Sequence, residues 1–164
     1  MSDAYVECMV ARKTPGYWVF LKYLLIVLTV VTGLLGLVAN LLLIAAIVFG
    51  VAAYFVNLYT DVEFEYLYLD KEITVDKVFN KTKRKRVKVF ELEKIEIMAP
   101  LKSYRLDGYK NRTFKELDLS SGIAGLPEVR YVFYYNGETK VIFEPNADFV
   151  KMCKNAAPRK VFTD

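Results

Sequence analysis

The densest charge in this sequence is a basic run at residues 80–88, NKTKRKRVK. It holds six cationic side chains in nine residues: Lys81, Lys83, Arg84, Lys85, Arg86 and Lys88. Such a density of Lys and Arg side chains suits an anionic partner: nucleic acid, an acidic protein surface or the headgroups of anionic lipid. The alternative is an exposed turn that is basic only because cytoplasmic loops beside membrane spans are basic.

The absence of histidine from the chain limits the catalytic chemistry open to it. General acid–base catalysis near neutral pH commonly uses histidine, and hydrolytic triads and many metal sites depend on it. Cys8 and Cys153 lie at opposite ends of the chain, outside any metal-ligand spacing, and no phosphate-cradling glycine loop occurs. We therefore predict a protein that is not an enzyme and that uses no cofactor and no metal ion.

The overall charge balance argues against a nucleic-acid partner. The chain has 23 Lys and Arg residues against 19 Asp and Glu, a net charge of +4. A protein that follows a phosphate backbone needs a larger basic surface than this small surplus provides. Membrane lipids, a protein partner or a second copy of the chain are the partners that we expect.

Residues 23–60 contain no Asp, Glu, Lys or Arg. A spanning helix needs about 20 apolar residues, so one helix would be too long for this segment and two would fit. We predict a membrane hairpin over residues 17–59, with helices at 17–37 and 41–59 and a tight turn between them. Small residues would allow close helix packing, namely Gly33, Gly36, Ala46 and Gly50. The alternative is one tilted helix followed by a buried soluble helix.

Aromatic and basic residues flank this apolar segment. The predicted membrane-interface anchors are Arg12, Lys13, Tyr17, Trp18, Lys22, Tyr54 and Tyr59. In a hairpin both groups fall on one face of the membrane, together with the basic run, whereas the hairpin tip is uncharged. The positive-inside rule then predicts a multi-pass protein of the cytoplasmic (inner) membrane, with both termini and the soluble domain in the cytoplasm.

The sequence after residue 60 has the two-residue period of half-buried strands. The stretch DVEFEYLYLD is predicted to be a strand with Val62, Phe64, Tyr66 and Tyr68 on one face. Further strands are predicted at 73–79 and 87–92 and around Ile95 and Ile97, with a turn at 80–85 and a short strand near 114–119. VRYVFYY and ETKVIFE flank Asn136-Gly137, which predicts a hairpin with a type I′ turn. A helix capped by Asn146 should follow, with Phe149, Met152 and Cys153 on its apolar side.

About seven antiparallel strands closed by one terminal helix is the element order of the pleckstrin-homology (PH) superfold. The run FEYLYLDKEITVDKVFNKTKRKRVKVFELEKIEIMAP resembles the first half of bacterial PH-like domains. The chain as a whole is similar to a family of small bacterial membrane proteins, in which a two-helix hairpin precedes such a domain. The resemblance implies a membrane-anchored α+β protein whose PH-like β-barrel, residues 60–164, is capped by its C-terminal helix. It implies a fold and no activity.

The N-terminal segment, residues 1–16, is expected on the cytoplasmic side. Tyr5, Val6 and Met9 have helical spacing, so a short interfacial helix is one expectation for it. The strand after residue 61 would run about 25 Å from the membrane and the next strand would return, which would bring the basic run back to the lipid surface. We predict a noncatalytic membrane-tethered binding or assembly module; the alternative is a protein that binds or senses anionic lipid through the basic run.

Overall fold

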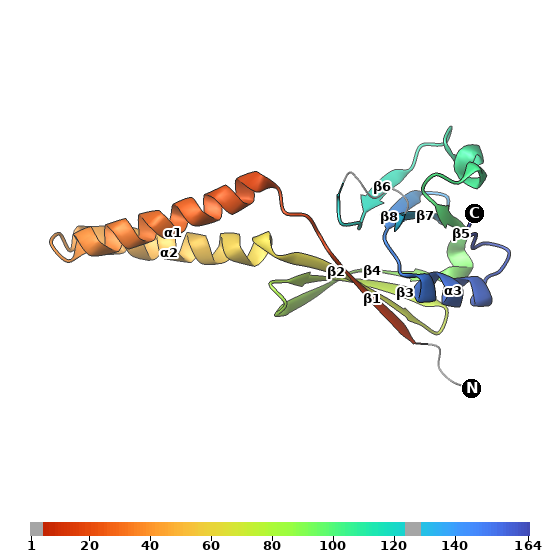
Figure 1. Ribbon diagram of the computed structural model, residues 1–164, viewed down its shortest axis with the longest axis horizontal. Helices are drawn as coiled ribbons and strands as arrows, with labels where there is room; N and C mark the ends of the chain where they lie inside the picture. The colour runs from red at the N-terminus through yellow and green to blue at the C-terminus, as the bar shows by residue number, and fades with distance from the viewer. Residues whose placement is uncertain (1–4, 124–128) are drawn as a thin grey trace. The chain divides into compact units, whose positions relative to one another are not determined.

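The computed structural model describes residues 5–123 and 129–164, so the first four residues of the predicted N-terminal segment lie outside it. Eight strands and three α-helices make up the described chain (Figure 1). In chain order these are β1 (Val6–Ala11), α1 (Gly16–Gly36), α2 (Leu41–Thr60), β2 (Val62–Leu69), β3 (Glu72–Phe79), β4 (Lys83–Glu91), β5 (Ile95–Pro100), β6 (Lys115–Asp118), β7 (Tyr131–Tyr135), β8 (Thr139–Phe143) and α3 (Ala147–Ala156). Short 3₁₀ helices occur at Leu92–Lys94 and Tyr104–Tyr109.

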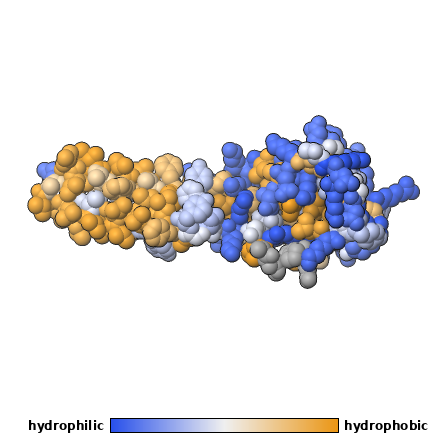
Figure 2. All heavy atoms as spheres, turned by 90° about the horizontal axis from the view of Figure 1, so that it is seen from above, coloured by the Kyte–Doolittle hydropathy of each residue, from blue (hydrophilic) through white to orange (hydrophobic). Residues whose placement is uncertain are grey.

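The chain divides into two compact units. Residues 13–62 and 79–83 form the helical unit, and the strands with α3 form the sheet unit. In the helical unit α1 and α2 run side by side in opposite directions (Figure 1). Both helices are long and apolar enough to cross a membrane. Most of their long apolar side chains are exposed, as the orange surface in Figure 2 shows, so neither is the buried soluble helix of the alternative reading.

The sheet unit contains two four-stranded sheets. Sheet A has the order β1-β2-β3-β4, and sheet B has the order β5-β7-β8-β6. The predicted closed barrel is wrong, because β1 and β4 are free edges of sheet A and β5 and β6 are free edges of sheet B. Pairing within sheet B is also not wholly antiparallel, since β6 lies parallel to β8.

Residues 6–11 of the N-terminal segment form a strand, so the short interfacial helix that was one expectation for this segment is wrong. β1 pairs antiparallel with β2, from Val6 opposite Tyr68 to Ala11 opposite Glu63. The burial of its side chains alternates, with Val6, Cys8 and Val10 packed against the core, as a period of two requires. The two-helix hairpin is therefore the connection between two neighbouring strands of sheet A, and one residue, Asp61, separates α2 from β2.

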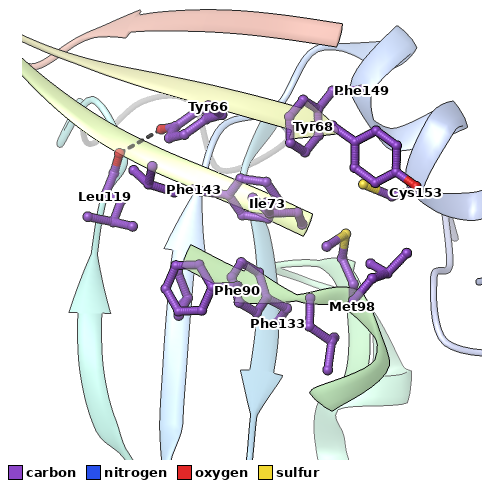
Figure 3. Close-up of a cluster of buried hydrophobic side chains, with 14 of the residues drawn as sticks. Tyr66, Tyr68, Ile73, Phe90, Met98, Leu119, Phe133, Phe143, Phe149 and Cys153 are labelled. Carbon is purple, nitrogen blue, oxygen red and sulfur yellow. Dashed lines mark hydrogen bonds between the residues drawn. The ribbon is translucent and has the colours of Figure 1, made fainter. Parts of the chain in front are cut away.

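The core of the sheet unit lies between the two sheets and α3. Phe64, Tyr66 and Tyr68 of β2 are buried, as the alternation predicted. The rings of Tyr66 and Tyr68 meet Phe149 of α3, and Cys153 belongs to the same buried cluster (Figure 3). The aromatic rings contact one another edge to face, an arrangement that their quadrupoles favour.

Short sequence signals explain the turn between β7 and β8 and the start of α3. Asn136 and Gly137 both have positive φ angles, 51° and 69°, which confirms the predicted type I′ turn between β7 and β8. The Asn146 side chain accepts a hydrogen bond of 2.8 Å from the Phe149 backbone N–H, which confirms the predicted cap of α3.

Candidate functional site

The basic run occupies a tight turn and the strand that follows it. Asn80 and Lys81 have φ angles of 46° and 54°, and the Thr82 N–H donates to the Phe79 carbonyl, so the β3–β4 connection has the features of a type I′ turn. The predicted turn over residues 80–85 is too long, since β4 already begins at Lys83. A two-residue turn of this type matches the twist of paired strands, which lets them pair almost up to the turn.

The turn at the start of the basic run is bound to the end of α2. The Asn80 N–H donates a hydrogen bond of 2.6 Å to the carbonyl of Asp61, the residue that follows α2. The rings of Tyr59 and Phe79 meet edge to face, with their centroids 5.5 Å apart. Lys81 and Lys83 therefore lie beside the C-terminal end of a helix long and apolar enough to span a membrane.

Two of the six cations in the basic run have acidic partners within the fold. Arg84 lies 3.1 Å from the Glu65 carboxylate, and Arg86 lies 3.4 Å from that of Asp76. Lys88 extends over the rings of Phe90 and Tyr135. In the part of the chain that the structure describes, Lys81, Lys83 and Lys85 take part in no ion pair, and all three are exposed.

Further cations gather around Lys77, which the sequence analysis did not single out. Burial lowers the pKa of Lys77, and the charges of Arg12 and Lys85 lower it further. Arg12 follows β1 and lies over the Phe64 ring, 5.6 Å from its centroid. Lys77 follows Ile73 and Val75 at the two-residue spacing that puts all three on one face of β3, and both Ile73 and Val75 are buried, so a lysine at a core-facing position was the signal that could have identified it.

An exposed cation that has no acidic partner within the fold is available to an external anion. We therefore define the candidate basic site as Lys81, Lys83 and Lys85, the three exposed lysines of the turn between β3 and β4 and of the first residues of β4.

The predicted interface anchors lie around one end of the helical unit or just before it. Tyr17, Trp18 and Lys22 belong to the first two turns of α1, whereas Tyr54 and Tyr59 belong to the last two turns of α2. The Thr14 hydroxyl donates to the carbonyl of Thr60, so the start of α1 is tied to the end of α2. Lys13 begins this unit, whereas Arg12 belongs to the sheet unit.

The predicted small residues lie where α1 and α2 meet. A Cβ built on Gly33 would lie 4.0 Å from the Cβ of Ala46, and one on Gly50 would lie 3.5 Å from the Thr29 methyl. Gly36 is the closest approach, because a Cβ there would lie 2.6 Å from a Leu43 methyl. These small residues therefore allow α1 and α2 to pack closely against each other.

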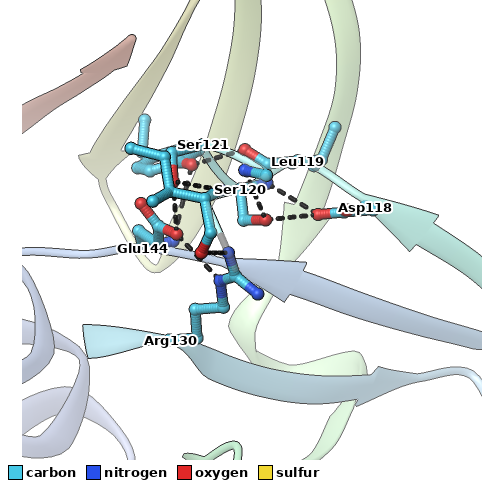
Figure 4. Close-up of polar contacts among 9 residues, drawn as sticks. Asp118, Leu119, Ser120, Ser121, Arg130 and Glu144 are labelled. Atoms are coloured by element: carbon cyan, nitrogen blue, oxygen red, sulfur yellow. Dashed lines mark hydrogen bonds and ion pairs between the residues drawn. The ribbon is translucent and has the colours of Figure 1, made fainter. Parts of the chain in front are cut away.

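A buried polar network supports the segment that follows β6 (Figure 4). The Glu144 carboxylate accepts hydrogen bonds from the Ser121 hydroxyl at 2.8 Å and from Arg130 Nε at 2.9 Å. Asp118 accepts from the backbone N–H and the hydroxyl of Ser120. Glu144 and Ser121 are less than a tenth exposed, so this network serves to hold the segment against β8.

No arrangement for metal chemistry occurs among residues 5–123 and 129–164, where no three His, Cys, Asp or Glu side chains could hold one ion. Burial raises the pKa of the Cys153 thiol to about 12, so this group is a thiol and not a reactive thiolate.

Comparison with known proteins agrees with this architecture of two sheets and a terminal helix. No curated protein and no solved structure matches the chain. The model of the family described as a bacterial PH-like domain (DUF6106) matches residues 2–163, and the chain therefore belongs to this family.

Proposed function

We propose that this protein is a noncatalytic PH-like module that α1 and α2 anchor in the cytoplasmic membrane and that docks on anionic lipid through its basic site. The observation that carries the proposal is the 2.6 Å hydrogen bond between Asn80 and Asp61. It keeps the cationic β3–β4 turn at the end of α2, where a spanning helix leaves the hydrocarbon core and reaches the headgroups.

The membrane insertion of α1 and α2 rests on their exposed apolar surface. A pair of helices of this length without a charged residue between 23 and 60 would be strongly unfavourable in water. If both helices span, the pairing of β1 with β2 requires both ends of the hairpin to lie in one compartment. The cations beside those ends favour the cytoplasm as that compartment.

The expected strength of docking follows from the cations that remain available. A juxtamembrane cation gains roughly 1 kcal/mol from an anionic leaflet, so Lys81, Lys83 and Lys85 would together contribute roughly 3 kcal/mol. Arg84 and Arg86 should add little, because Glu65 and Asp76 already neutralise them. The attraction decays within about 10 Å at 0.1 M salt, so docking should weaken steeply as the ionic strength rises.

The experiment uses the full chain, because a fragment that begins at residue 61 would lack β1. Thr82→Cys, in a background of Cys8→Ala and Cys153→Ala, places an environment-sensitive fluorophore on the exposed turn. Nanodiscs of phosphatidylcholine alone are compared with nanodiscs that also contain phosphatidylglycerol. We expect a blue-shifted emission, and quenching by brominated lipid, only with the anionic lipid and only at low salt.

Two matched variants identify the cations responsible. Replacing Lys81, Lys83 and Lys85 with Gln should abolish the lipid-dependent shift. Replacing Lys102, Lys115 and Lys151, three exposed cations outside the basic site, should leave it intact. Identical emission in neutral and anionic nanodiscs, or equal effects of both triple variants, would refute lipid docking.

A second candidate function is assembly with a protein partner, which the open edge of sheet A favours. β4 is an edge strand, and residues 83–88 on it are all exposed, so an acidic extended segment could pair with it. Exposed lysines commonly protect edge strands from such pairing, which is why we rank this candidate second. Site-specific cross-linking from Val87 in native membranes would test it, since a discrete adduct is expected only if a partner covers this edge.

A further inference from the structure

A pocket separate from the basic site lies where α3 ends. Its volume is about 350 Å³, and it is lined by residues 156–160 together with Lys71, Leu92 and Glu93. This volume lies in the lower part of the range of about 300–1,000 Å³ that is usual for small-molecule sites. We call it the α3-end pocket.

Backbone hydrogen bonds hold both walls of the α3-end pocket in place. On one wall the Leu92 N–H donates 2.8 Å to the Lys71 carbonyl, which fixes the β2–β3 turn against the 3₁₀ helix at Leu92–Lys94. On the other wall the segment after α3 is fixed to β5, because the Met98 N–H donates 2.8 Å to the Lys160 carbonyl. Because these hydrogen bonds already order both walls, ligand binding would cost little conformational entropy in this part of the chain.

Half of the residues that line the pocket are apolar, and we call its three cations, Lys71, Arg159 and Lys160, the rim. Leu92, Ala156, Ala157 and Pro158 supply side chains without hydrogen-bonding groups. Three cations and one carboxylate complete the lining: Lys71, Arg159, Lys160 and Glu93.

The cations on the rim are only partly neutralised. Lys71 Nζ lies 3.7 Å from the Glu93 carboxylate, a long pair between two largely exposed side chains. The ammonium group of Lys160 donates to the backbone carbonyl of Glu93 and not to its carboxylate. Arg159 takes part in no ion pair among the residues that the structure describes.

We propose that the α3-end pocket binds a small organic anion that consists of a compact apolar group and one carboxylate. The apolar group would enter against Leu92 and Ala157, and the carboxylate would remain at the rim beside Lys71 and Arg159. A cation of the same size would meet a lining with a surplus of positive charge, and a two-chain lipid would be too large for about 350 Å³. This site goes beyond the proposed lipid docking and shares no residue with it.

N-acetyl-leucine and its neutral analogue N-acetyl-leucinamide are the probes that test this proposal. Each is titrated into the full chain in phosphatidylcholine nanodiscs, with the alanine methyl groups isotopically labelled for NMR. We expect saturable shifts at Ala156 and Ala157 with a millimolar dissociation constant, as suits so small a ligand. The carboxylate probe should bind about fivefold more tightly than the amide.

Two double variants test whether Lys71 and Arg159 cause the tighter binding of the carboxylate probe. Lys71→Gln combined with Arg159→Gln should reduce the difference between the two probes to within about twofold, because the exposed cations that favour the carboxylate are gone. Lys102→Gln combined with Lys151→Gln, which removes the same charge elsewhere, should keep it. Equal binding of both probes to the wild type, no saturable shift at Ala156 or Ala157, or a preference that persists in the rim variant would each overturn the proposal.

Discussion

Ala11 and Glu63 face each other across the β1–β2 ladder, although the whole two-helix hairpin lies between them in the chain. A connection between paired antiparallel strands has to begin and end at the same place. The hairpin is therefore an insertion into a β-hairpin, and its two ends lie on the same side of a membrane if both helices span it.

The first prediction concerns topology. Single cysteines at Lys13, Asn40 and Lys102, in a background of Cys8→Ala and Cys153→Ala, report three points along the chain. We expect Lys13→Cys and Lys102→Cys to react with a membrane-impermeant maleimide in inverted vesicles, and Asn40→Cys at the hairpin tip to react only in intact spheroplasts. Labelling of residues 13 and 102 from opposite sides would contradict the ladder-based topology.

The second prediction concerns the closest approach of the helices. Gly36→Ala would place its Cβ 2.6 Å from a Leu43 methyl and 3.0 Å from the Leu43 backbone nitrogen, so the tip of the hairpin has to separate. We expect a loss of about 1–3 kcal/mol in the unfolding free energy of the hairpin in detergent. Gly33→Ala is the control, since its Cβ would meet Ala46 at 4.0 Å and should change stability by less than about 0.5 kcal/mol.

The third prediction concerns the buried hydroxyl of Tyr66. It donates a hydrogen bond of 2.6 Å to the Leu119 carbonyl (Figure 3). It also accepts a hydrogen bond of 3.4 Å from the Glu144 backbone N–H. Tyr66→Phe leaves both backbone groups without this partner in a fully buried place and should cost about 1–3 kcal/mol in chemical denaturation. Tyr104→Phe, at an exposed position, is the control and should cost less than about 0.5 kcal/mol. Equal losses of stability in the two variants would show that the hydrogen bonds of Tyr66 do not stabilise the fold.

The fourth prediction concerns the response of sheet A to pH. Burial, and next the hydrogen bond with Glu7, raise the pKa of the Glu65 carboxyl above its ordinary value of 4.5. A group with a raised pKa in the folded state stabilises the fold below its ordinary pKa, and this stabilisation is lost as pH rises through the raised value. Glu65→Gln removes the loss, so the variant should gain stability relative to the wild type as pH rises above the ordinary value of 4.5.

Denaturant unfolding followed by tyrosine fluorescence at several pH values measures this gain. The neighbouring Glu7 titrates in the opposite sense, because its hydrogen bond with Glu65 lowers its pKa. The measurement should therefore include the double variant with Glu7→Gln, which removes the coupling between the two carboxyls. A stability difference between Glu65→Gln and wild type that stays constant with pH would contradict the assignment.

Elements with local signals were predictable from the sequence. The residues of β2 alternate in polarity along the strand. Asn136-Gly137 identifies the turn between β7 and β8 by residue type alone. Asn146 precedes a stripe of apolar residues at helical spacing, which identifies the start of α3. The match to the bacterial PH-like family confirms the resemblance that these patterns carry. Each signal lies within a short window, so neither long-range pairing nor tertiary context is needed to recognise it.

Elements that depend on distant partners were not predictable. β1 has six residues, and its alternation becomes visible only once β2, beyond the hairpin, is known to pair with it. The turns at Asp70-Lys71 and Asn80-Lys81 place lysine at positive φ, which sequence preference disfavours and strand pairing imposes. The same limit explains why Lys77 was missed, whereas the residues of the basic run were found by their density alone.

The single residue between α2 and β2, and the four between β1 and α1, have a mechanical consequence. Each helix is joined almost directly to one of two adjacent strands, so little slack remains to absorb a change in the angle between the helices. If both helices span a membrane, a thicker or thinner bilayer that altered this angle would strain the β1–β2 ladder. The stability of the sheet would then depend on bilayer thickness.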